Sequence, residues 1–172
     1  MTSAPVTSVA GPGAPAADGA PQRGLPRRAV PHAPLDSADV LSPTEVVGRK
    51  IIRADDAYLE GHYPEMTVYP GVFLVESVCQ AVIHLVRETH GEGVTPEPAV
   101  LESVRFTTAL RPGDVLDVHC ACRPGAAEDT LAVTARCTSG ASKVATMKIT
   151  FRLVKDTAET GDPCTTMRPS AV

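Results

Sequence analysis

The chain has 172 residues, a formal net charge of −4 at pH 7, 43% hydrophobic residues and 3% aromatic residues. This composition is typical of one globular domain with a sizeable core, and it lacks the dense basic runs and stacking aromatics of a nucleic-acid-binding protein. No apolar run reaches the roughly 18 residues that a membrane helix needs, so the sequence indicates no membrane span.

The two ends of the chain differ in composition from the middle. Residues 1–34 are rich in Ala, Pro and Gly and contain seven of the 16 prolines. Such a segment buries too little apolar surface to offset the entropy lost on ordering, so we predict a disordered tail. Residues 156–172 are polar and contain proline, and we predict a second flexible tail there. One domain, 35–155, lies between the tails.

The first half of this domain contains a predicted strand and a predicted helix. Residues 46–53 form the strand, and 55–69 form a turn-rich, extended connection. The helix covers 71–89, since Pro70 precedes it and His90-Gly91 ends it. Apolar side chains surround most of this helix, which predicts that it is buried. They are Val72, Phe73, Leu74, Val75, Val78, Val82, Ile83, Leu85 and Val86.

The second half of the domain is a series of predicted strands. They cover 99–109, 115–122, 130–138 and 143–154, with turn signals at 111–114 and 124–125 between them. One helix followed by a meander of long strands predicts an α+β domain in which an antiparallel sheet wraps around a helix.

The cysteines indicate a reducing compartment. Their number is odd and most lie in apolar segments, which is typical of reduced thiols in a cytoplasmic protein. They are Cys79, Cys120, Cys122, Cys137 and Cys164. Cys120 and Cys122 share one face of a predicted strand, and His119 beside them makes a metal site conceivable. A second ligand pair is missing from this spacing, so we favour small buried side chains and no metal.

The segment 61–80, GHYPEMTVYPGVFLVESVCQ, carries the chemistry. His62 lies in a turn, where an imidazole is able to accept a proton at neutral pH. Glu76 lies in the apolar helix, where burial would favour a protonated, proton-donating carboxyl. Gly71 lies at the helix start, where a free backbone N–H is able to polarise a carbonyl group. A turn histidine or a helical glutamate alone is usually a solvated surface group, but their combination indicates a site.

The spacing of these residues resembles that of the 3-hydroxyacyl-acyl carrier protein dehydratases, the FabZ/FabA group. Glu76 follows His62 by 14 residues and Gly71 by five, and Gln80 follows one helical turn later. The resemblance extends over about 40–154 and includes Val104-Arg105-Phe106 and Arg111-Pro112-Gly113-Asp114.

The resemblance implies a hot-dog fold, an antiparallel sheet wrapped around one long helix. It implies dimers, or hexamers of three dimers, with His62 from one chain and Glu76 from the other. His62 would be the base at Cα, Glu76 the acid for the leaving hydroxyl, and the Gly71 N–H the donor to the thioester carbonyl. Gln80 and Tyr63 would support them, and no metal or redox cofactor is implied. Glu rather than Asp at position 76 favours a plain dehydratase over a dehydratase-isomerase.

The sequence departs from the family at the rim of the site. Glu65-Met66-Thr67 replaces a Gly-Lys-Pro, and Tyr63 replaces the commoner Phe. These changes remove a positive charge where an acidic carrier protein would dock. Arg105 and Arg111 are then the candidate carrier contacts, with solvated surface as the alternative role. His84, two helical turns after Glu76, is interpreted as a core or interface histidine.

The sequence therefore predicts dehydration of (3R)-3-hydroxyacyl thioesters on acyl carrier protein to trans-2-enoyl thioesters, in fatty acid or polyketide biosynthesis. One alternative is a hot-dog acyl thioesterase that uses Glu76 to activate water. The other is a non-catalytic acyl-binding subunit that forms a heterodimer with an active paralogue.

Overall fold

A computed structural model describes residues 33–56, 59, 62, 63 and 65–155. The predicted tails, 1–34 and 156–172, lie outside these residues except for positions 33 and 34. The described part contains one helix and one six-stranded sheet. The elements are β1 (Ser37–Ser42), β2 (Glu45–Ile51), α1 (Gly71–His90), β3 (Val94–Phe106), β4 (Val115–Pro124), β5 (Thr130–Ser139) and β6 (Ser142–Lys155).

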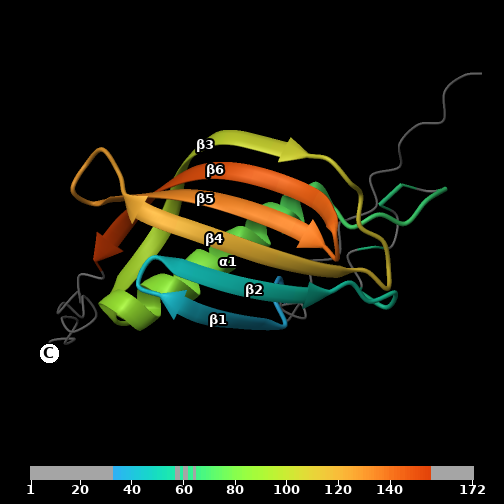
Figure 1. The fold of residues 1–172 in the computed structure, drawn as a ribbon, viewed down its shortest axis with the longest axis horizontal. Helices are drawn as coiled ribbons and strands as arrows, with labels where there is room; N and C mark the ends of the chain where they lie inside the picture. Colours follow the sequence, from blue (N-terminus) through green and yellow to red (C-terminus); the bar gives the residue numbers. More distant parts are fainter. Residues whose placement is uncertain (1–32, 57–58, 60–61, 64, 156–172) are drawn as a thin grey trace, which may run out of the picture. The chain divides into compact units, whose positions relative to one another are not determined.

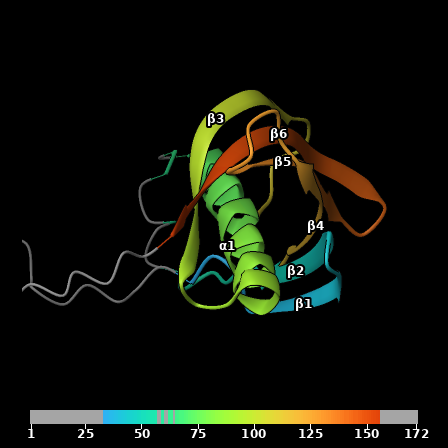
Figure 2. The ribbon, with the colours of Figure 1, turned by 90° about the vertical axis from the view of Figure 1, so that its left-hand side faces the viewer.

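The strands form a single antiparallel sheet in the order β1-β2-β4-β5-β6-β3 (Figure 1). The sheet curves around α1, which lies on its concave side (Figure 2). This architecture confirms the predicted α+β, hot-dog class. The long hairpins β4–β5 and β5–β6 fix the register of the central strands, while the β2–α1 and α1–β3 connections carry the chain across the concave side.

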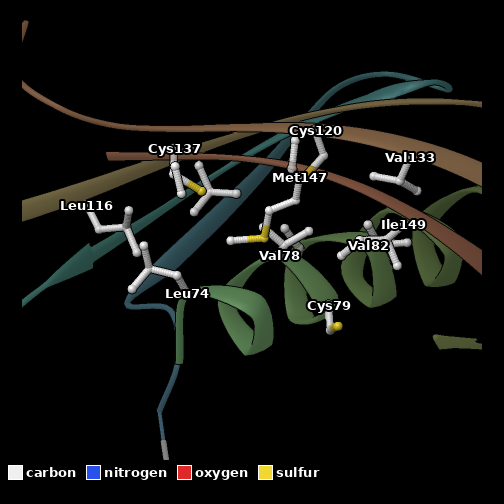
Figure 3. Close-up of a cluster of buried hydrophobic side chains, with 14 of the residues drawn as sticks. Leu74, Val78, Cys79, Val82, Leu116, Cys120, Val133, Cys137, Met147 and Ile149 are labelled. Atoms are coloured by element: carbon white, nitrogen blue, oxygen red, sulfur yellow. The ribbon is translucent and has the colours of Figure 1, made fainter. Parts of the chain in front are cut away.

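The core lies between α1 and the inner face of the sheet. Successive side chains of a strand point to opposite faces, so Leu116, Val118 and Cys120 of β4 are buried whereas His119 is exposed. Figure 3 shows Leu74, Val78 and Val82 of α1 on the side facing these strands, with Cys79 on the opposite side of the helix. The largest fully buried side chain is Phe151 of β6.

Two strands differ from the prediction. β1 was not predicted, because Ser37–Ser42 is short and half polar. This segment forms a strand because it pairs with β2. β3 starts at Val94, whereas the prediction starts at 99. The earlier residues were not predicted as strand because Pro96 and Pro98 are typical of a strand break. Within the described residues β3 pairs only with β6, and an edge strand tolerates proline because one row of its N–H groups needs no partner.

The helix matches its prediction to within one residue. Gly91 ends it with a φ of 84° and donates its N–H to the Arg87 carbonyl at 3.0 Å. The prediction that α1 is buried on most sides is wrong at Val72, which is 69% exposed. Val72 lies in the first turn of α1, outside the buried face that begins at Leu74.

Candidate active site

His62 lies in the connection between β2 and α1, where the structure fixes its ring. Its Nδ1 lies 3.1 Å from the Val68 carbonyl oxygen, and the backbone N–H of His62 donates to the Leu59 carbonyl at 3.3 Å. Because a carbonyl oxygen only accepts hydrogen bonds, the contact selects the tautomer with the proton on Nδ1. The Nε2 lone pair of the neutral ring is therefore available to accept a proton.

Tyr63 continues the same turn in a strained conformation. Its φ is 63°, a left-handed value that is unusual for a bulky residue. The turn is closed by a hydrogen bond from the Met66 N–H to the Tyr63 carbonyl at 3.2 Å. The Tyr63 ring meets the His62 ring edge-on, with centroids 4.6 Å apart, and is 63% exposed. This aromatic side chain therefore covers one side of the imidazole at the surface of the chain.

Glu76 is half-buried in the second turn of α1, and Gln80 orients it. The Gln80 side-chain amide donates to Glu76 Oε1 at 2.8 Å. Residues four apart share a helix face, so the helix holds this pair in place. Oε2 is left without a hydrogen-bond partner from the described residues and is available to a ligand.

Gly71 begins α1, and the end of the helix there is uncapped. Its N-cap, Pro70, forms no side-chain cap, and the first turn contains no acidic residue. The positive end of the helix dipole is therefore balanced by no side-chain cap and no first-turn carboxylate of the described chain, although the Phe73 N–H donates to the Pro70 carbonyl at 3.0 Å. A Cβ at position 71 would lie 3.0 Å from Cζ of Phe106, so any larger residue there would crowd this ring and the ring would have to shift.

The structure does not join His62 to Glu76 directly. Among the described residues these two side chains share no hydrogen bond or ion pair, and their hydrogen-bond partners are Val68 and Gln80. A single chain therefore holds the His62 imidazole and the Glu76 carboxyl as separate groups, each with its own hydrogen-bond partner.

The two arginines predicted to contact a carrier protein differ in position. Arg111 follows the end of β3, and its Nη2 lies 3.5 Å from Met66 Sδ, which places this cation beside the His62 turn. Arg105 is exposed on β3, opposite Thr146 of β6. His84 lines a surface cavity of about 240 Å³ together with Gln80 and the segment before β1.

The cysteines of the described chain are structural. Cys79, Cys120, Cys122 and Cys137 are buried and unpaired, whereas Cys164 lies outside the described residues. Burial raises the pKa of Cys122 to about 11 and that of Cys137 to about 12, and it also raises the pKa of Cys120. His119 points to the opposite face of β4 from Cys120 and Cys122, and the described residues contain no group of ligands suited to a metal.

Sequence reasoning missed a polar cluster behind the site. Lys50 of β2 is 3% exposed and lies between Asp36 and Asp56. Tyr69 lies close enough for both carboxylates to raise its pKa, although burial is the main cause of a value of about 12. The nearby Ser77 hydroxyl lowers the pKa of Tyr69 by a smaller amount. Ser77 donates its own proton to the Pro34 and Phe73 carbonyls. The Tyr69 hydroxyl has no hydrogen-bond partner among the described residues.

Comparison with known proteins shows the family of the chain. Residues 39–153 match the protein family described as ApeI dehydratase, ApeI-like. The chain is 36% identical over 87 residues to the 3-hydroxyacyl-[acyl-carrier-protein] dehydratase FabZ of Lactobacillus helveticus, covering 49% of this chain and 59% of that protein. It is 34% identical over 93 residues to the FabZ of Clostridium perfringens, covering 54% and 66%. The chain thus spans about three-fifths to two-thirds of these relatives.

Solved structures share the fold. The dehydratase heterocomplex ApeI:P of Xenorhabdus doucetiae superposes with a TM-score of 0.52 at 18% identity, covering 69% of this chain and 96% of that chain. The fluoroacetyl-CoA thioesterase FlK superposes with a TM-score of 0.57 at 14% identity, covering 68% and 90%. No helix in the described part of the chain is long and apolar enough to cross a membrane.

Proposed function

This chain belongs to the ApeI-like dehydratase family, and we propose that it converts (3R)-3-hydroxyacyl thioesters on acyl carrier protein to trans-2-enoyl thioesters. The observation that carries the proposal is the contact between His62 Nδ1 and the Val68 carbonyl, which leaves Nε2 as a base with a defined direction. A thioester carbonyl acidifies the neighbouring Cα–H, so a histidine base is matched to this proton.

The proposed reaction assigns one step to each group. His62 Nε2 removes the Cα proton, while the Val68 carbonyl stabilises the resulting imidazolium through Nδ1–H. The Gly71 N–H donates to the thioester carbonyl oxygen as negative charge develops on it. Glu76 donates a proton to the C3 hydroxyl, the C–O bond breaks, and water leaves as the Cα=Cβ bond forms. His62 then loses its proton and Glu76 regains one before the next turnover.

We further propose that two chains complete each site, with His62 from one and Glu76 from the other. The absence of a direct contact between them in one chain supports this arrangement. So does the apolar surface that the single chain leaves open near the site, since Val72, Val100 and Phe106 are each more than half exposed. Homodimers and trimers of dimers would each supply two chains to such a site. A heterodimer with a paralogue would do so as well, and the similar ApeI:P structure is a heterocomplex.

The second candidate is an acyl thioesterase, favoured by the fold similarity to FlK. In that reaction Glu76 would activate water against the thioester carbonyl, and His62 would have no assigned step. The two activities differ in product, because a thioesterase releases a free thiol whereas a dehydratase retains the thioester.

The proposal is tested by incubating the protein with 3-hydroxyacyl-carrier proteins of different chain lengths and following intact mass. We expect loss of water without release of free thiol, and activity that depends on both His62 and Glu76. Wild-type turnover by both His62→Ala and Glu76→Gln would contradict the proposed roles. Activity that appears only after a second protein is added would identify the chain as one subunit of a heteromeric dehydratase.

A further inference from the structure

Lys50 is a cationic residue that is buried on the inner face of the sheet. On β2 the residues Val46, Gly48 and Lys50 alternate inward, and the register places Lys50 opposite Leu116 of β4. Lys50 is the only charged side chain among the buried residues in the described part of the chain. Lysine is rarely buried at this depth unless its charge is paired, so the contacts of its ammonium group identify its role.

The ammonium group lies between carboxylates from two different segments. Its Nζ is 3.7 Å from Asp36 Oδ1, just before β1, and 4.0 Å from Asp56 Oδ2, in the connection after β2. Asp36 is also held by the Ile51 N–H at 2.6 Å and by Arg53 Nη1 at 2.8 Å. Asp56 Oδ2 accepts one further hydrogen bond, from the Arg53 N–H at 3.2 Å. Asp56 therefore depends on Lys50 for its charge partner more than Asp36 does.

A short series of hydrogen bonds leads from Asp56 to His62. The Leu59 N–H donates to the Asp56 carbonyl at 3.0 Å, and the His62 N–H donates to the Leu59 carbonyl at 3.3 Å. Leu59 itself is 3% exposed and packs in the core. The N-terminal side of the His62 turn is thus attached to the core at Leu59 and to Lys50 of β2 through Asp56, and Val68 holds the ring from the C-terminal side.

We propose that Lys50 is a positioning residue for His62. Its buried ammonium group fixes the start of the connection at Asp56, and the hydrogen bonds through Leu59 transmit that position to the His62 backbone. Lys50 touches no reacting atom in the proposed reaction. The catalytic consequence of this placement rests on the proposed function, whereas the effect on the His62 ring does not.

The first test compares Lys50→Met with the matched control Tyr69→Phe. Both variants remove a buried polar group from the same cluster, but only Lys50 forms an ion pair with Asp56. We expect Lys50→Met to lower kcat by roughly 10- to 100-fold, since small displacements of a catalytic group have effects of this size, and to leave KM largely unchanged. Tyr69→Phe should retain wild-type kcat.

The milder variant Asp56→Asn guards against misfolding of Lys50→Met. It retains an oxygen that accepts from the Arg53 N–H but removes the charge paired with Lys50. If both residues act through one connection, the double variant should be little worse than either single variant. Additive losses of kcat would overturn the proposal.

The second test observes the His62 ring without substrate, by ¹⁵N NMR of labelled imidazole nitrogens. We expect the neutral wild-type ring to be protonated on Nδ1, and Lys50→Met to contain a mixture of tautomers. An unchanged His62 spectrum in both Lys50→Met and Asp56→Asn would overturn the proposal, whatever their melting temperatures. If the variants change the His62 spectrum but the wild-type protein has no dehydratase activity, the positioning role is supported and the proposed function is rejected.

Discussion

Phe151 and Phe106 lie on neighbouring strands, β6 and β3, yet one is fully buried and the other is 51% exposed. The difference separates two regions of the molecule. In the first, α1 and the strands β4, β5 and β6 bury one another. In the second, the His62 turn, the start of α1 and β3 leave apolar side chains exposed beside the partly exposed His62 and Glu76. Stability resides mainly in the first region, and we infer that the second is completed by another molecule.

The largest expected effect separates chemistry from stability. His62→Ala and Glu76→Gln should each lower dehydratase turnover by about 10²–10⁴-fold, because each would remove one proton-transfer group of the proposed reaction. The melting temperature should change little, since both side chains are only partly buried in the chain. Turnover and thermal unfolding of the two variants check this. A large loss of stability in either would break the separation between the two regions.

The two phenylalanines give the next comparison. Phe151→Ala should lower the free energy of unfolding by about 3–5 kcal/mol, the usual result of truncating a fully buried aromatic side chain. Phe106→Ala should lower it less, and by an amount that changes with protein concentration if another chain covers the ring. Urea unfolding at two protein concentrations measures both. Equal, concentration-independent losses would contradict the comparison.

A smaller effect is expected at the start of the helix. Gly71→Ala places a methyl group 3.0 Å from the Phe106 ring, so either the ring or the helix start must shift. We expect kcat/KM to fall roughly 10- to 100-fold. Part of the activity should return in Gly71→Ala combined with Phe106→Leu, which removes the ring. If the double variant is no more active than Gly71→Ala, crowding against the Phe106 ring is not the cause of the loss, and a displaced backbone N–H at position 71 is.

The smallest effect concerns acid stability. Burial acts to raise the pKa of Asp36, but the Ile51 N–H and the cations of Arg53 and Lys50 together lower it below the ordinary value of 3.8. A carboxyl with a lowered folded pKa contributes stability above its unfolded pKa and loses it as pH falls through the folded pKa. Between those two values Asp36→Asn should have a flatter dependence of unfolding free energy on pH than the wild type. Curves that stay parallel through the whole interval from the folded pKa up to 3.8 would contradict this.

Much of the fold could be predicted from the sequence. The α+β class and the bounds of α1 follow from local signals, Pro70 before the helix and Gly91 after it. β1 and the first residues of β3 could not be predicted, because their order depends on pairing with β2 and β6 rather than on their own composition. The predicted domain 35–155 and its two tails remain predictions.

The candidate site divides in the same way. The sequence supplied His62, Gly71 and Glu76 through their spacing, and the Gln80 contact through helical periodicity. Lys50 was missed, because a lysine in a strand is normally exposed. The inward position of its side chain, shared with Val46 and Gly48, was the signal that could have identified it.

Sequence alone determined the chemical groups and their order along the chain, because helix caps, strand alternation and residue spacing are local properties. Only the tertiary structure decided which nitrogen of His62 is free, since the backbone conformation between β2 and α1 brings the Val68 carbonyl to the Nδ1 atom. It also decided that Lys50 is buried beside Asp56 and that Phe106 lies open against Gly71. Contacts of this kind depend on register and packing between segments distant in sequence, which no local pattern specifies.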